Sequence, residues 1–205
     1  MAYWIEQKAD CQSRARQKTK MGFWKKFCIC IVILAGIGYG IWHDEDFQRK
    51  YMYPYPYRQF IEYYADRYQM DECLIAGVAL AESKFEPTAQ SVHGAQGIMQ
   101  IMPETAAWIA YQIEDDDFSA AEMYEPEKNI KYGTWYLASL NEEFLGNKVL
   151  MLAAYNAGRG NVHEWMEKYG WDENFSDYKQ IPFPETREYV QKVLKYERKY
   201  KKLYK

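Results

Sequence analysis

Glu82 is the ionisable residue that departs most clearly from the sequence around it. It closes a run of apolar and small residues, Cys73–Ala81, and lies four residues after Val78 and seven after Ile75. In a helix these offsets place its carboxylate on the face that turns toward the core. Burial should raise its pKa, and a carboxyl group that stays protonated near neutral pH can act as a general acid. A core glutamate held by backbone or tyrosine hydroxyl groups, or an exposed glutamate at the helix end, would give the same pattern.

Three later segments have residue types that suit the border of a binding cleft. The loop Ser91–Ala106 is rich in small residues and glycine, which let the backbone approach a ligand closely. The segment Ala154–Val162 places Tyr155 and Asn156 at a predicted helix end, just before two glycines. The segment Ile181–Val193 leads into the last predicted helix. These segments are candidates for the surroundings of Glu82.

Other common chemistries find no support in the residue pattern. The four cysteines match no zinc site, and none of the histidines has a partner at metal-binding spacing: His43, His93 and His163. The acidic run Asp115–Asp117 lacks the spaced oxygen ligands and the glycine of an EF-hand loop, so it is interpreted as a solvated loop. No nucleophile elbow, Walker loop or dinucleotide fingerprint occurs. The sequence therefore implies neither a metal nor an organic cofactor.

Five blocks of the sequence, in this order, resemble the SLT-type lytic transglycosylase domain, which is related in fold to goose-type lysozyme. They read ES-x-F-x-P-x-A, GA-x-G-I-MQ-I-MP-x-TA, NI-x-x-G-x-x-YL, AYNAG-x-G-x-V and IPF-x-ET-x-x-YV. One block alone would be a weak signal, whereas five in order at compatible distances are specific. The resemblance covers about residues 60–200, and its blocks are Glu82–Ala89, Gly94–Ala107, Asn129–Leu137, Ala154–Val162 and Ile181–Val190.

The resemblance implies a role for several residues. Glu82 corresponds to the single catalytic acid/base, and Tyr155 to the tyrosine beside that carboxyl group, with Asn156 next to it in the motif. Three residues correspond to positions that border the sugar subsites, although methionine suits a core position equally well: Ser91, Gln100 and Met102. Glu185 and Tyr189 correspond to the closing motif that supports the floor of the cleft, and Ser83 is expected to form a structural hydrogen bond at the helix end.

The reaction implied by the resemblance needs only one carboxyl group. The resemblance implies cleavage of the β-1,4 bond between N-acetylmuramic acid and N-acetylglucosamine in peptidoglycan, with the muramic 6-hydroxyl closing a 1,6-anhydro ring. Ordinary glycosidases need a second carboxylate, and the candidates Glu86, Glu104 and Glu185 fall at no position that the motif makes catalytic. A lysozyme-like muramidase that uses water is one alternative. A wall-binding or scaffold protein without activity is another.

The elements that must position these residues are all predicted to be helices. Asp71 can cap a helix over Glu72–Lys84, and Pro103 and Pro126 suit first helical positions. The remaining segments with helical periodicity are Arg58–Gln69, Glu104–Ala110, Glu127–Phe144, Lys148–Tyr155, Val162–Tyr169 and Glu185–Leu203. In the last of these, three tyrosines recur every four residues and can pack on the domain: Tyr196, Tyr200 and Tyr204. The predicted fold class is all-α, a lysozyme-like helical catalytic domain behind an N-terminal transmembrane signal anchor.

The anchor is predicted from an uncharged stretch of 16 residues, Phe27–Trp42. Seven basic and two acidic residues occur in residues 1–43, and the run Asp44–Asp46 is acidic, so the N-terminus should lie in the cytoplasm. A cleaved signal peptide and a buried core helix are the alternatives. The predicted organisation is a cytoplasmic basic segment (1–26), the anchor (27–43), a Tyr/Pro-rich spacer with an extended, polyproline-like conformation (44–57) and the catalytic domain (58–205).

Charge and location define the expected partners. The formal net charge of −3 disfavours a nucleic-acid-binding protein. The predicted location is the cell membrane, as a single-pass protein whose catalytic domain is extracytoplasmic. Its expected partners are peptidoglycan glycan strands and, through the N-terminal anchor, the cytoplasmic membrane. Cell-wall or secretion-machinery proteins are compatible with the sequence as further partners.

Overall fold

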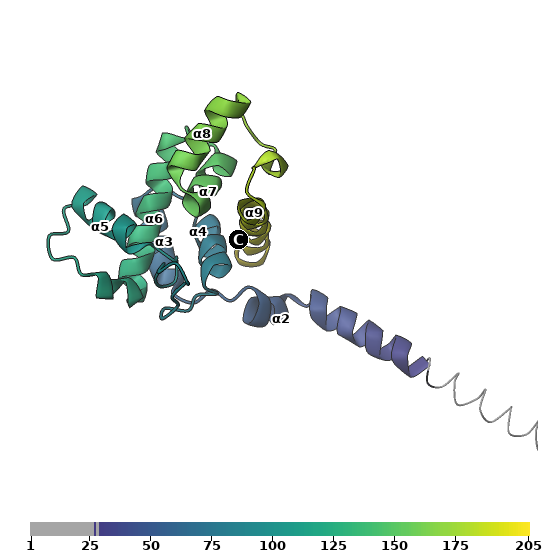
Figure 1. Ribbon diagram of the computed structural model, residues 1–205. Coiled ribbons are helices and arrows are strands. Elements are labelled where there is room, and N and C mark those ends of the chain that lie inside the picture. The colour runs from purple at the N-terminus through teal and green to yellow at the C-terminus, as the bar shows by residue number, and fades with distance from the viewer. Residues whose placement is uncertain (1–26, 28) are drawn as a thin grey trace, which may run out of the picture. The chain divides into compact units, whose positions relative to one another are not determined.

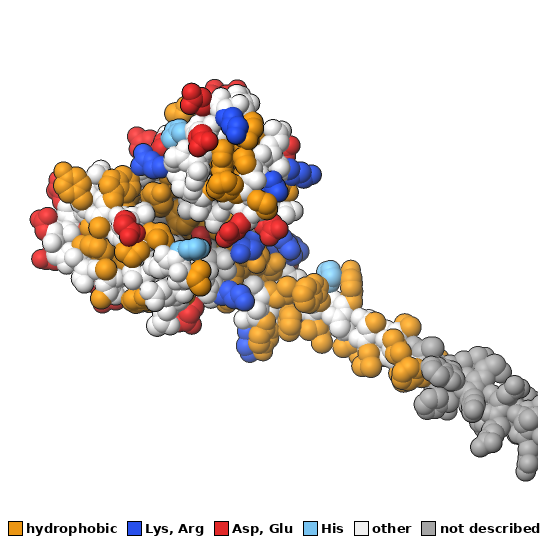
Figure 2. Space-filling model, in the orientation of Figure 1, with side chains coloured by type: hydrophobic (Ala, Val, Ile, Leu, Met, Phe, Trp, Pro, Cys, Tyr) orange, Lys and Arg blue, Asp and Glu red, His pale blue; other side chains and the backbone are white. Residues whose placement is uncertain are grey.

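The computed structural model describes residue 27 and residues 29–205, which divide into two compact units, one up to Met52 and one from Tyr53 to Lys205. The predicted cytoplasmic segment, 1–26, lies outside the described residues. In the first unit a helix over residues 29–43 is followed by α2 (Glu45–Phe47) and by a π-helical turn, η1 (Gln48–Met52). Figure 2 shows that side chains on the first of these helices are mostly hydrophobic. Within the described part of the chain, no helix combines the length and the apolar character needed to span a bilayer.

The second unit is built from seven α-helices with two 3-10 turns (Figure 1). Among residues 53–205 no strand forms, and only isolated bridges join Gln90 to Gln96 and Gln96 to Ile101. The all-α prediction is therefore confirmed for the described residues. The elements are α3 (Arg58–Arg67), α4 (Glu72–Glu82), α5 (Pro103–Gln112), η2 (Ala120–Tyr124), α6 (Pro126–Glu143), α7 (Lys148–Ala157), α8 (Arg159–Tyr169), η3 (Tyr178–Gln180) and α9 (Pro184–Tyr204).

Local chemistry explains most helix boundaries. The Asp71 carboxylate accepts a hydrogen bond from the Cys73 backbone N–H at 2.9 Å and begins α4, as the sequence predicted. Pro103 and Pro126 occupy the first turns of α5 and α6. The boundary between α7 and α8 differs from the prediction, which ended one helix at Tyr155 and began the next at Val162. In the structure only Gly158 separates the two helices. Its φ of 90° stops one helix and allows the next to begin at once.

Helix α4 is the centre of the core and packs along α9. All residues from Cys73 to Leu80 are buried. Gly77 permits the close approach, since a Cβ atom at this position would lie 3.1 Å from the Glu197 backbone nitrogen. At the other end of the contact, the Lys201 ammonium lies 2.7 Å from the Asp71 carboxylate. The packing of α4 on α9 therefore fixes the helix that ends in Glu82.

The Tyr/Pro run does not form a free extended stalk, because its tyrosines pack on the end of α9. Tyr53 is only 5% exposed, and its ring lies edge-on to that of Tyr200. The Tyr200 hydroxyl donates to the Pro54 carbonyl at 2.6 Å, and the Tyr204 hydroxyl donates to the Tyr53 carbonyl at 2.8 Å. We call these contacts, with the ring of Tyr55 against Tyr200 and Tyr204, the tyrosine clasp. The predicted tyrosine stripe of the last helix is thus confirmed, whereas the polyproline stalk is not.

Candidate active site

Glu82 is the last residue of α4 and is partly buried where the core meets the surface. Burial raises the pKa of its carboxyl group to about 7, and this effect outweighs the opposing influence of the Tyr189 hydroxyl and the Lys192 ammonium. The raised pKa agrees in direction with what the helical register predicts. A carboxyl group with this pKa is partly protonated near neutral pH and can donate or accept a proton.

Two tyrosines from other helices flank this carboxyl group. Tyr189, on α9, is 6% exposed, and Tyr155, on α7, donates a hydrogen bond from its hydroxyl to the Met99 carbonyl at 2.8 Å. Burial, together with the negative charge of Glu82, raises the pKa of both hydroxyl groups well above the usual value. Both tyrosines therefore remain protonated hydrogen-bond donors beside the acid.

Lys192 adds a positive charge close to Glu82. It lies one helical turn after Tyr189 on α9, and its ammonium group donates to the carbonyl of Ala81 at 3.0 Å. That carbonyl belongs to the last turn of α4, where the helix dipole is negative. The lysine therefore caps the end of α4 and stabilises the ionised form of Glu82, although less strongly than burial disfavours it.

The loop after α4 is held in place by partly buried hydrogen bonds. The Ser83 hydroxyl donates to the Ile98 carbonyl at 2.7 Å, which is the kind of helix-end bond that the sequence predicted. The Gln100 side-chain amide donates to the Gly97 carbonyl at 2.8 Å. Gly97 has a φ of +75°, and a Cβ atom there would lie 2.1 Å from the Met123 carbonyl oxygen. Only glycine fits this close approach of loop and backbone.

Asn129 is the residue that organises this loop and that sequence reasoning left without a role. It is fully buried on α6, and its side-chain oxygen accepts from the Met99 N–H at 2.7 Å. Its amide group donates to the carbonyls of Gln96 and Met123 at 3.0 and 2.8 Å. The Met99 carbonyl in turn holds Tyr155. The sequence does contain a signal for this role, because Asn129 is a polar residue at an inward position of a predicted helix and begins the NI-x-x-G-x-x-YL block.

A hollow of about 270 Å³ brings together four of the predicted site residues: Gln100, Met102, Tyr155 and Asn156. Thr105, Tyr136 and Gly158 line it as well. The Asn156 side-chain oxygen accepts from the Thr186 hydroxyl at 2.8 Å, so this asparagine is also tied to α9.

The other five predicted site residues are not among those that line this hollow: Glu82, Ser83, Tyr189, Ser91 and Glu185. The Ser91 hydroxyl oxygen accepts hydrogen bonds from the backbone N–H groups of His93 and Ala95, at 3.3 and 3.0 Å, and so shapes a turn of the loop. Glu185 is exposed in the first turn of α9.

The fold and this site together define an all-helical domain of the lysozyme-like class. Residues 59–177 match the family model described as the transglycosylase SLT domain, and residues 180–205 match the soluble lytic transglycosylase helical domain. The chain belongs to the transglycosylase SLT family.

Individual relatives agree with this assignment. The chain is 34% identical to the soluble lytic murein transglycosylase of Escherichia coli K12 over 151 residues, which are 73% of this chain and 23% of the relative. It is 32% identical to the membrane-bound lytic murein transglycosylase C of Actinobacillus pleuropneumoniae, over 70% of this chain and 45% of the relative. The crystal structure of the 70 kDa soluble lytic transglycosylase of E. coli superposes with a TM-score of 0.71 at 31% identity, over 83% of this chain and 27% of that one. The chain thus spans about a quarter of the length of the soluble relatives.

Proposed function

We propose that this chain is a peptidoglycan lytic transglycosylase that cleaves the β-1,4 bond between N-acetylmuramic acid and N-acetylglucosamine. The observation that carries the proposal is Glu82, a carboxyl group with a pKa of about 7 at the end of a buried helix, flanked by two protonated tyrosines. Membership of the SLT family supports the substrate, because the matched relatives are named lytic murein transglycosylases.

In the proposed reaction one carboxyl group acts twice. Glu82 first gives its proton to the glycosidic oxygen as the bond from that oxygen to the anomeric carbon breaks. The resulting carboxylate then takes the proton of the muramic 6-hydroxyl, whose oxygen forms the new bond to the anomeric carbon and closes the 1,6-anhydro ring. The exposure of Glu86, Glu104 and Glu185 supports a mechanism without a second carboxylate, since none of them is enclosed with Glu82.

Mass spectrometry of the products tests this function. Purified sacculi digested with the full-length protein should release muropeptides that end in 1,6-anhydromuramic acid, each lighter by one water than its hydrolytic counterpart. Reducing muramic ends would instead indicate a muramidase. An absence of released muropeptides from enzyme that is folded would favour the wall-binding or scaffold alternative.

We further propose that residues 27–43 anchor the protein in the cytoplasmic membrane, with residues 1–26 in the cytoplasm and residues 58–205 outside. Residues 44–57 connect the anchor to the domain, and the tyrosines at their end, Tyr53 and Tyr55, pack on α9 instead of forming a free stalk. The exposed apolar side chains of the helix over residues 29–43 support the anchor, as do the basic residues before it and the acidic run Asp44–Asp46 after it. One matched relative, transglycosylase C, is named as membrane-bound.

Protease treatment of intact protoplasts tests the anchor. The second unit should be degraded while an epitope placed at the N-terminus stays protected, because the flanking charges retain the basic end in the cytoplasm. Disruption of the membrane should then expose the epitope. Protection of the second unit in intact protoplasts would reverse the topology and contradict a cell-wall substrate.

A further inference from the structure

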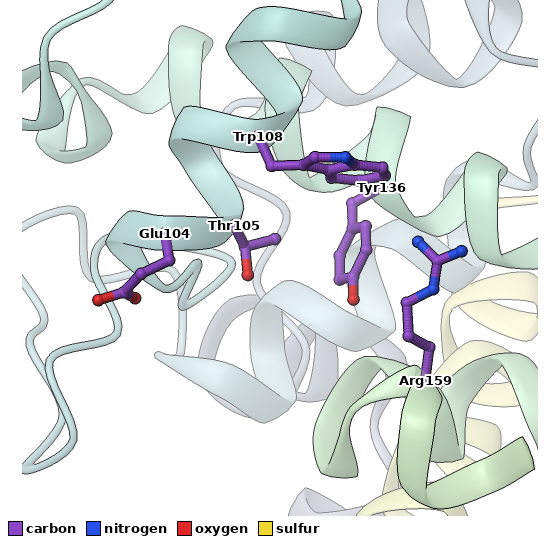
Figure 3. Close-up of a pocket in the computed structure, with 5 residues that line it drawn as sticks. All are labelled: Glu104, Thr105, Trp108, Tyr136 and Arg159. Atoms are coloured by element: carbon purple, nitrogen blue, oxygen red, sulfur yellow. The ribbon is translucent and has the colours of Figure 1, made fainter.

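A second hollow, of about 300 Å³, adjoins the one beside Tyr155. It is lined by Glu104, Thr105, Trp108, Tyr136 and Arg159 (Figure 3). Thr105 and Tyr136 line both hollows, so the two are adjacent. In Figure 3 the indole of Trp108, from α5, lies across one side of the space, while Tyr136 and Arg159 approach it from α6 and α8.

Aromatic rings follow this path away from the acid. The ring of Tyr136 lies 5.5 Å from that of Tyr155 and 6.2 Å from that of Trp108, and Trp108 lies 5.4 Å from Trp135. Trp108 and Trp135 then line a third hollow of about 500 Å³. Its rim is mostly polar, and includes Gln69, Gln112, Ser139, Asn141 and Glu142.

The Trp108 ring is held in place before any ligand arrives. The Arg159 guanidinium lies 5.6 Å from the centre of the indole, and the carboxylate of Glu143 fixes that guanidinium at 2.9 Å. The Glu143 carboxylate also contacts the His163 ring at 2.6 Å. Trp108 and Trp135 nevertheless keep part of their surface in solvent. Large aromatic side chains that are preorganised and partly exposed are typical of binding surfaces.

The charges around these hollows favour a neutral ligand. The cation of Arg159 is already paired with Glu143, and the rim carries the exposed carboxylates of Glu104 and Glu142. An anionic stem peptide would meet these carboxylates without a free cation among the lining residues. A sugar ring, by contrast, offers C–H faces to the indoles, and its hydroxyl and acetamido groups can bond to the amide groups of the rim.

We propose that Trp108 and Trp135 form an outlying glycan platform, which binds neutral N-acetylhexosamine units of the strand at a distance from the bond that is cleaved. The inference rests on the proposed function, because the shared lining residues and the row of aromatic rings that leads from Tyr155 point to the same glycan strand as the ligand. The platform raises the affinity for long strands relative to short ones and holds the strand beside the hollow next to Tyr155.

Calorimetric binding of β-1,4-linked N-acetylglucosamine oligomers to the full-length protein tests the platform. Glu82→Gln serves as the background, so that the ligand is not consumed. Adding Trp108→Ala should weaken binding of the hexamer roughly threefold to tenfold, the range expected for one lost aromatic contact, and leave the trimer unaffected. Trp108→Phe should restore most of the hexamer affinity, since it returns a ring to the same place.

Tyr111→Ala is the matched control, because Tyr111 lies on the same helix, α5, and is 81% exposed. Unchanged hexamer affinity in Trp108→Ala would overturn the platform, as would an equal loss for trimer and hexamer. A loss confined to ligands that carry stem peptides would overturn it in favour of a peptide site. Digestion of sacculi by the protein with Trp108→Ala alone separates the two proposals. If it still produces anhydro ends, a negative binding result overturns the platform but not the proposed function.

Discussion

Glu82→Gln is expected to abolish turnover of peptidoglycan while the fold is retained. The two side chains have nearly the same shape, so the substitution removes the proton donor and base without opening a cavity. General acid–base catalysis contributes roughly 10²–10⁴-fold to a rate, and the other candidate carboxyl groups, Glu86, Glu104 and Glu185, are all exposed and not placed to take over the role. Release of soluble muropeptides from purified sacculi measures the loss, and circular dichroism checks the fold.

Glu86→Gln is the matched control for this experiment. Glu86 is four residues further along, is exposed, and its carboxylate accepts a hydrogen bond from the Thr88 hydroxyl at 2.6 Å. This interaction lowers its pKa, so Glu86 is ionised at neutral pH and unsuited to donate a proton. The control should keep most of the activity. Retention of more than about a hundredth of the activity by Glu82→Gln would contradict its role as the acid.

The same substitution should change how stability depends on pH. The pKa of Glu82 is raised from 4.5 to about 7 in the folded protein, so between these values the unfolded chain has lost the proton that the folded chain keeps. Ionisation therefore favours the unfolded state, and the stability contributed by the protonated carboxyl group declines as the pH rises through this window. Glu82→Gln lacks this decline, so above pH 7 it should unfold at a higher temperature than the wild type.

Asn129→Ala is expected to destabilise the protein by roughly 3 kcal/mol or more. The substitution removes two buried hydrogen bonds and one partly buried one, and leaves the Met99 N–H and the carbonyls of Gln96 and Met123 without their partner. Each buried polar group left unsatisfied costs about 1–3 kcal/mol. Chemical denaturation of the full-length protein measures the free energy of unfolding.

Asn141→Ala on the same helix is the control for Asn129→Ala. Asn141 is partly exposed on α6, so its replacement should change the free energy of unfolding by no more than about 0.5 kcal/mol. A similar decrease in the free energy of unfolding for both variants would mean that the hydrogen bonds of Asn129 do not contribute more to stability than an exposed side chain does. A loss of activity without a loss of stability in Asn129→Ala would also contradict this structural role.

Much of the fold could be predicted because the relevant signals are local. Asp71, Pro103 and Pro126 mark the starts of helices by their own chemistry. The helical register alone predicts that Glu82 lies on the face that points toward the core. The motif blocks then predicted Tyr155 and Asn156 as neighbours of one site, and the structure places both on a single hollow with Gln100.

What escaped prediction depends on contacts between residues that are distant in the sequence. The Tyr/Pro run has the local preferences of an extended segment, but Tyr53 finds its partner in Tyr204 near the other end of the chain. The hydrogen bonds of Asn129 likewise reach a loop about 30 residues earlier. The sequence does not distinguish Trp108 and Trp135 from core aromatics, because partial exposure is a property of the assembled helices.

The tyrosine clasp has a mechanical consequence. A pull on the chain where it enters the domain acts first on Tyr53 and Pro54, whose carbonyls are fastened to α9 and not to the start of α3. The load passes along α9 into its packing with α4, where it is carried as shear across a buried interface. Helix α3 is thereby spared from being peeled off turn by turn. If residues 27–43 hold the chain at a membrane as proposed, tension from that end would therefore leave Glu82 in its place at the end of α4.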